Sequence, residues 1–351
     1  MFSSLPFGYM FLSVMGLGTL LSVSSIHWLG IWAGLEINLI GFLPMLVYQK
    51  STAESESAVK YFIVQALGSS FLIFGSLMAF NMSFTWDVVS KMWLSGNFGL
   101  IMIMMGLYMK LGLFPFHYWL PGVMAGLPWN SCLLLATWQK LAPLFLVLSL
   151  LELNQSYLVG LVLCLVSAGS SLIGGLGGMN QTQVRALLAY SSIGHLGWMV
   201  FAAMQGEWVM KAYLGIYMLI SLSMFLSLWY SDSGLMKHIN NLKSNSPLQL
   251  SIMLLLLSLG GLTPLISICF KVTCHYKSED KALVVFYFFV DFGFPHKVVL
   301  LLKFVFHYIS IKAEKKWNGD NYVENKGVII INILNVFGGS LVLVSGLLNF
   351  L

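Results

Sequence analysis

Residues 101–119 read IMIMMGLYMKLGLFPFHYW, and this stretch decides what kind of protein the chain is. It is long and apolar enough for a membrane helix, yet it carries the charged side chain of Lys110. Gly112 and Pro115 follow closely, and a proline removes a helical hydrogen bond because its nitrogen has no hydrogen. The stretch predicts a membrane helix broken beside a buried charge. The plainer alternative is a proline kink in a packed helix.

The composition of the whole chain is also that of a membrane protein. Of the 351 residues, 58% are hydrophobic and 9% are charged, whereas soluble proteins carry about 25% charged residues. The mean hydropathy is +0.85. So few charges could not cover the surface of a soluble globule of this size. The net charge of +5 comes from dispersed lysines, which argues against a nucleic-acid-binding protein.

Apolar runs predict an all-α, polytopic membrane protein with about eleven transmembrane helices, since one span needs about 20 apolar residues. Residues 1–351 then form a single transmembrane domain. The connections on one side carry eight Lys or Arg residues and those on the other side carry four. This bias places the N-terminus on the negative, cytoplasm-like side. The runs lie near residues 4–23, 26–48, 59–81, 97–119, 129–150, 156–176, 185–205, 210–230, 248–272, 282–310 and 328–350.

Ionisable side chains lie within several of these apolar runs. An ionisable group at the bilayer centre costs at least about 2.5–3.5 kcal/mol, so each is a candidate functional residue. Burial disfavours the charged form of lysine and of glutamate, and movement of a neighbouring charge changes their proton affinity. Such a row of groups predicts a proton pathway in the membrane plane. Its members are Glu36, Lys110, Lys140, His195 and Lys271.

Structural alternatives remain open for each of these residues. A buried pair of charges can simply order two helices. His195 can be an ordinary hydrogen-bonded core histidine. Lys60 opens the third run four residues after Glu56, which is the spacing of an ion pair on a helix surface near the membrane interface.

A second set of helix-breaking residues precedes Lys271. It consists of Gly260, Gly261 and Pro264, so two of the predicted helices carry breaks beside a lysine. Discontinuous helices in corresponding halves of a chain are typical of the ion path of a transporter.

Motifs for cofactor binding are absent from the sequence. The string GGLGGMN at 174–180 lacks the strand–turn–helix context of a dinucleotide site, and we interpret its glycines as helix-packing residues. There is no P-loop, no HExxH motif and no histidine pair suited to haem. We therefore expect that this chain binds no cofactor and no metal, and that the cofactors of any associated redox reaction lie elsewhere.

Five strings, in this order and spacing, closely resemble the chain 2 family of antiporter-like membrane subunits in mitochondrial NADH:ubiquinone oxidoreductase, respiratory complex I. The resemblance covers roughly residues 20–265 and is specific, because the motifs are long and independent. The strings are HWLGIWAGLEIN (27–38), ESAVKYFIVQALGSS (56–70), MKLGLFPFHYWLPGV (109–123), TWQKLAP (137–143) and GGMNQTQVRALLAYSSIGHLGWM (177–199).

The resemblance implies a fold of two inverted five-helix repeats with broken helices, near residues 4–150 and 156–310, followed by a terminal helix near 328–350. It also implies roles for the residues above. After residue 262 the chain reads TPLISICFKV and departs from the family pattern, although Pro264 and Lys271 remain. The implied roles are the controlling glutamate (Glu36), a residue of the entrance (Lys60), the first broken-helix lysine (Lys110), the central lysine (Lys140), the matching group of the second repeat (His195) and the exit lysine (Lys271).

The function implied by the resemblance is that of a core membrane-arm subunit in a proton-translocating NADH dehydrogenase of the respiratory chain. NADH, FMN, iron–sulfur clusters and ubiquinone would bind to partner subunits, so this chain would carry no redox centre. It would be a multi-pass protein of the mitochondrial inner membrane, surrounded by lipid and other membrane-arm subunits, with its N-terminus in the matrix. Two alternatives stay open, namely a stand-alone cation/proton antiporter and a structural or assembly module of the membrane arm.

Overall fold

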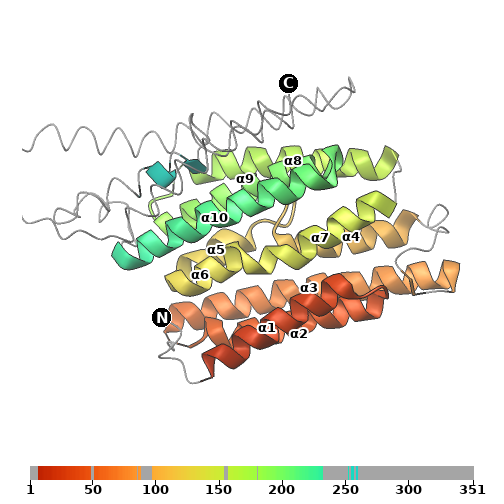
Figure 1. The fold of residues 1–351 in the computed structure, drawn as a ribbon, viewed down its shortest axis with the longest axis horizontal. Coiled ribbons are helices and arrows are strands. Elements are labelled where there is room, and N and C mark those ends of the chain that lie inside the picture. Colours follow the sequence, from red (N-terminus) through yellow and green to blue (C-terminus); the bar gives the residue numbers. More distant parts are fainter. Residues whose placement is uncertain are drawn as a thin grey trace, which may run out of the picture. The chain divides into compact units, whose positions relative to one another are not determined.

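The computed structural model describes residues 7–48, 51–84, 86–87, 97–153, 157–179, 181–231, 252, 254–256 and 258–259. These residues are almost entirely helical (Figure 1). The helices are α1 (Gly8–Ser24), α2 (Trp28–Leu46), α3 (Thr52–Ser83), α4 (Asn97–Leu111), α5 (Trp119–Gly126), α6 (Trp129–Ala136), α7 (Trp138–Leu153), α8 (Tyr157–Gly178), α9 (Val184–Gln205) and α10 (Glu207–Ser231).

Six segments within the described residues are long and apolar enough to cross a membrane. They cover α2, α3, α6 with α7, α8, α9 and α10, while α1 and residues 98–111 form shorter apolar helices. The chain is therefore a helical, multi-pass membrane protein. The total of eleven spans stays a prediction, because most of the last three predicted runs lies outside the described residues.

The chain divides into two compact units, Met1–Leu163 and Cys164–Leu351. The described part of the first unit contains α1 to α7 and the beginning of α8. The described part of the second unit contains the rest of α8, followed by α9 and α10.

Glycines bring α1 and α2 together in the first unit, where the two helices lie side by side (Figure 1). A Cβ atom on Gly18 would lie 2.5 Å from the backbone nitrogen of Asn38, and one on Gly34 would lie 2.5 Å from that of Ser22. Real side chains do not approach backbone atoms this closely. The absence of side chains at these positions therefore allows backbone-to-backbone contact, which is a common basis of helix association in membranes.

The glycines at 174–180 have the same role in the second unit. A Cβ atom on Gly174 would lie 2.6 Å from the backbone nitrogen of Gly194, and one on Gly177 would meet the ring of Tyr190 at 2.3 Å. Both contacts join α8 to α9. The interpretation of this string as helix packing is therefore confirmed.

Helix α3 begins at Thr52, earlier than the predicted run that starts at residue 59. The side chain of Ser51 accepts a hydrogen bond from the backbone N–H of Glu54 at 3.2 Å, which satisfies one of the free donors of the first turn. Polar residues thus form the first turns of α3, and a hydropathy pattern alone does not include them.

We expect Gly18→Ala to lower the apparent melting temperature of the detergent-purified protein by several degrees. The added methyl group would collide with the backbone of α2, and such overpacking costs about 1–3 kcal/mol. Gly16→Ala is the matched control on the same helix, because nothing lies within 4 Å of the added Cβ atom. Equal melting curves for the two variants, followed by tryptophan fluorescence, would refute close packing at Gly18.

Candidate functional site

Glu36 and Lys110 form a buried ion pair between α2 and α4. The Lys110 ammonium lies 3.6 Å from Oε1 of Glu36, which is too long for a hydrogen bond but close enough for strong attraction. The Lys110 side chain is 3% exposed and the Glu36 side chain 25% exposed. Within this chain the pair is thus enclosed at the lysine and partly exposed at the carboxylate.

Lys110 occupies the last turn of α4, directly before the chain leaves the helix. Gly112 has a φ of +74°, a left-handed conformation that residues with a Cβ atom rarely adopt. The chain stays non-helical until α5 begins at Trp119, and Pro115 lies in this interval. A helix C-terminus carries partial negative charge, so the break itself favours a cation at this position.

The break frees backbone carbonyl groups, and a side chain from α3 satisfies one of them. The C=O of Lys110 has no helical partner beyond the break, and Nε2 of Gln65 donates a hydrogen bond to it at 3.3 Å. The N–H groups of Gly112 and Leu113 both donate to the carbonyl of Tyr108, which closes the end of α4. The non-helical segment is thus stabilised from within the first unit, as membrane burial requires.

Lys140 is 4% exposed and lies in the first turn of α7. Thr137 alone separates α6, which ends at Ala136, from α7, which begins at Trp138. Thr137 has φ and ψ of −112° and −72°, and its hydroxyl donates to the carbonyl of Leu133. A second interruption in helical geometry therefore lies just before a second buried lysine.

A small cavity in the first unit is lined by both lysines. It encloses about 20 Å³ of water-accessible space, which is enough for about one water molecule. Trp119 also lines it, and the buried indole N–H of Trp119 has no hydrogen-bond partner among the described residues. A polar cavity of this size can hold a water molecule that hydrogen-bonds to its lining groups. The polar residues of the lining are Asn38, Tyr61, Gln65, Lys110, Gln139 and Lys140.

Lys60 does not line this cavity, although the next residue, Tyr61, does. Its ammonium is 2.6 Å from Oε1 of Glu56 one helical turn earlier, and the two side chains are 53% and 68% exposed. This is the geometry of a surface ion pair on the first turns of α3. The Lys60 side chain is thus exposed on this chain, in contrast to the two buried lysines.

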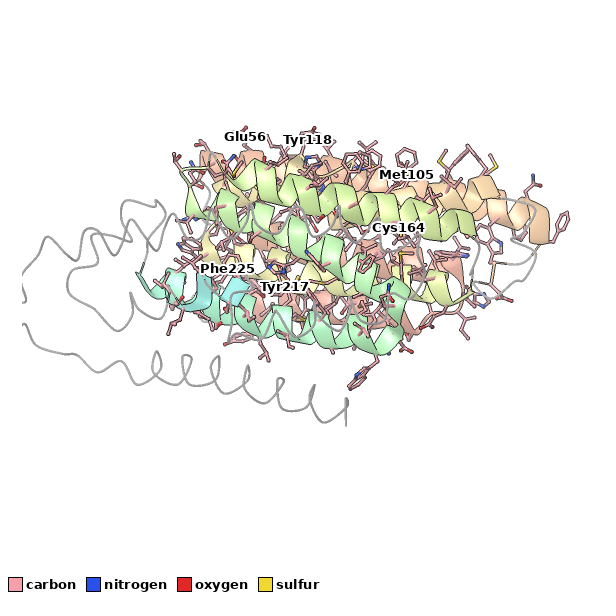
Figure 2. All side chains as sticks on the ribbon, turned by 90° about the horizontal axis from the view of Figure 1, so that it is seen from above. Glu56, Met105, Tyr118, Cys164, Tyr217 and Phe225 are labelled. Atoms are coloured by element: carbon pink, nitrogen blue, oxygen red, sulfur yellow. The ribbon has the colours of Figure 1, made fainter. Side chains whose placement is uncertain are left out.

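His195 lies in the second unit, on α9, and is 3% exposed. Its Nδ1 lies 2.9 Å from the hydroxyl oxygen of Tyr213 on α10, and its ring centroid lies 5.3 Å from that of Tyr217. Figure 2 labels Tyr217 on α10. A hydroxyl within hydrogen-bond distance can orient the imidazole ring and influence which nitrogen carries its proton.

The second predicted break lies outside the described residues, together with the lysine that follows it. These are Gly260, Gly261, Pro264 and Lys271. In the part of the chain that the structure describes, no group of three or more histidine, cysteine or acidic side chains could hold a metal ion.

Sequence reasoning missed four neutral residues that share the cavity with the lysines. Asn38, Tyr61, Gln65 and Gln139 carry no charge, so a search for charges in apolar runs does not select them. The three amides in this set, Asn38, Gln65 and Gln139, do give a weaker indication in the sequence. A side-chain amide is also costly to bury in a membrane unless it is hydrogen-bonded.

Comparison with known protein families identifies the family of this chain. The model of the NADH:quinone oxidoreductase/Mrp antiporter transmembrane family matches residues 25–292, which is more than half of the chain. The chain belongs to this family. The family description joins two kinds of membrane protein, the subunits of a redox enzyme and the antiporters.

Relatives within the NADH:quinone oxidoreductase/Mrp antiporter family are similar over most of their length. NADH-ubiquinone oxidoreductase chain 2 of Anopheles gambiae is 42% identical over 256 residues, which are 72% of this chain and 72% of that protein. The protein of the same name from Lumbricus terrestris is 38% identical over 256 residues, with the same two coverages. Their similarity confirms the resemblance noted in the sequence.

The fold also matches a family structure. A chain of respiratory complex I from Thermus thermophilus with bound aureothin superposes with a TM-score of 0.79 at 24% identity. The match covers 98% of this chain and 78% of that chain. At this level of identity the likeness supports the fold alone.

We expect Glu36→Gln to destabilise the protein more than the double change Glu36→Gln and Lys110→Met. The single change leaves a buried ammonium without its carboxylate, whereas the double change removes both charges, so we expect the single variant to be less stable by about 2 kcal/mol. Thermal unfolding in detergent would measure the order. If the double variant melts lower than the single variant, the two side chains do not act as a pair.

Proposed function

We propose that this chain is a core membrane-arm subunit of NADH:ubiquinone oxidoreductase, complex I, in the mitochondrial inner membrane. Its part in the reaction is to move protons across the membrane while partner subunits pass electrons from NADH to ubiquinone. One observation carries the proposal: the buried Glu36–Lys110 pair adjoins a water-sized cavity that Lys140 also lines. Relatives named NADH-ubiquinone oxidoreductase chain 2 support the assignment to the redox complex rather than to an antiporter.

In this proposal the Glu36–Lys110 ion pair couples quinone chemistry in a partner subunit to the release and uptake of a proton by Lys110. A buried ammonium is stable only while an opposite charge lies near it, since the energy of two charges in a medium of low dielectric constant depends steeply on their separation. If quinone chemistry in a partner subunit moves Glu36 away, Lys110 favours its neutral form and releases its proton. When Glu36 returns, Lys110 takes up another proton.

The cavity provides the next step of the path. A water molecule in it accepts the proton from Lys110 and passes it to the neutral amine of Lys140, which is also buried and lines the same cavity. Lys60 is assigned to the side of proton uptake, where its exposed ammonium meets water. The family resemblance assigns His195 to the matching position of the second repeat and Lys271 to the exit side. It assigns Pro115, Gly260, Gly261 and Pro264 to the broken helices.

Electron transfer takes place in other subunits under this proposal. NADH, FMN, the iron–sulfur clusters and ubiquinone bind to partner chains, and this chain contributes no redox centre. Its neighbours are lipids and other membrane-arm subunits. The excess of Lys and Arg on one set of connections supports an N-terminus on the matrix side.

We expect Lys140→Met to abolish the proton pumping that this subunit contributes, because methionine keeps the apolar bulk but cannot bind a proton. The measurement is the ratio of protons moved to NADH oxidised in sealed inner-membrane vesicles. Lys211→Met is the matched control, since Lys211 is 44% exposed and pairs with Glu207 on the surface of α10. A full ratio in an assembled Lys140→Met complex would disprove the proposed path.

We also expect the chain to migrate in a large assembly on native electrophoresis of solubilised inner membranes. That band should oxidise NADH in an in-gel stain, and mass spectrometry of its peptides should contain this chain. Migration as a small species without NADH activity would contradict the complex I assignment and favour an independent antiporter.

A further inference from the structure

Gln139 connects four helices of the first unit at a single side chain. Its Oε1 accepts a hydrogen bond from Nδ2 of Asn38 on α2 at 2.9 Å and lies 3.4 Å from the hydroxyl of Tyr61 on α3. Its Nε2 lies 3.3 Å from the sulfur of Met15 on α1 and donates to Oδ1 of Asn38, also at 3.3 Å. Gln139 itself belongs to the first turn of α7.

The two amides of Asn38 and Gln139 therefore form a reciprocal pair, in which each group both donates and accepts. Such a pair satisfies the polar atoms that face each other without introducing a charge. Asn38 is 4% exposed, and both residues line the cavity. In an apolar environment a paired amide is held in place, because breaking the pair leaves buried donors and acceptors unsatisfied.

The position of the pair along the chain connects it to the charged groups. Gln139 directly precedes Lys140, and Asn38 lies two residues after Glu36. The first turn of α7 also lacks one of its own hydrogen bonds, since Pro143 has no N–H to donate to the carbonyl of Gln139. With the α6–α7 interruption on one side and this proline on the other, the turn that carries Lys140 depends on side-chain contacts for its position.

We propose that the Asn38–Gln139 amide pair is a positioning element, which holds the first turn of α7 against α2 so that Lys140 stays at the cavity shared with Lys110. The inference rests on the proposed function and adds to it a mechanical link between the helix of Glu36 and the helix of Lys140. Neither amide binds or releases a proton at working pH. The amide pair positions the groups that transfer the proton, but neither amide carries the proton itself.

The test breaks the Asn38–Gln139 pair with one conservative substitution and then restores it with a second substitution. Gln139→Asn keeps the amide but shortens the side chain by one methylene, so it no longer reaches Asn38. The exchanged double variant Asn38→Gln with Gln139→Asn returns that methylene on the opposite partner and can form the pair again. The proton-to-NADH ratio is measured on the assembled complex in inner-membrane vesicles, beside Lys140→Met and wild type. Gln181→Asn, at the turn between α8 and α9, is the matched control for the same chemical change.

We expect Gln139→Asn to cause at least half of the loss of ratio that Lys140→Met causes, and the exchanged double variant to restore most of it. The control Gln181→Asn should keep the wild-type ratio. A purely packing role would change the amount of assembled complex without changing the ratio per complex, and that result would overturn the inference. Equal losses in the single and the exchanged variants would overturn it too.

Two further results separate this inference from the proposed function. If Lys140→Met leaves the ratio unchanged, the proton path itself is wrong. If Lys140→Met lowers the ratio while Gln139→Asn does not, the path stands and the positioning role is wrong. Should Gln139→Asn fail to assemble, Asn38→Ser breaks the same pair from α2 and is compared in the same way.

Discussion

The attraction between a carboxylate on α2 and an ammonium at the end of α4 is the interaction on which the rest of the site depends. Lys110 can be buried there because Glu36 lies 3.6 Å away and because a helix ends beside it. That helix end in turn needs a partner for its free carbonyl, and Gln65 supplies one from α3. The Glu36 carboxylate, the end of α4 and the Gln65 amide thus together stabilise polar groups that water would solvate at a protein surface.

Much of this site could be predicted from the sequence, because charges in apolar runs are conspicuous. The apolar runs point to Glu36, Lys110 and Lys140 as candidate functional residues, and the structure buries both lysines beside one cavity. Gln139 and Asn38 escaped prediction, since an amide carries no charge and its partner lies about a hundred residues away in the chain. The contact between His195 and Tyr213 likewise depends on how α9 packs against α10, which no local pattern encodes.

The helices also differ in how far nearby residues alone predict them. Apolar runs predicted most spans, but the start of α3 depends on a capping serine rather than on hydropathy. Gly174 and Gly177 could be interpreted as packing residues because glycines have few other uses in a membrane helix. The family model covers both NADH:quinone oxidoreductase subunits and Mrp antiporters, so the fold alone does not separate the two kinds of protein.

The size of the cavity between the lysines has a consequence for ion selectivity. A space of about 20 Å³ accepts about one water molecule, whereas a hydrated sodium ion brings several waters with it. Among the described residues that line the cavity, two are lysines and none is a carboxylate, which opposes entry of a metal cation whenever the lysines are protonated. Under the proposed function, charge crosses this point as a proton that passes from one carrier to the next rather than as a hydrated metal cation. The proposed path would then exclude hydrated metal cations by the size of this cavity, without a separate site that recognises them.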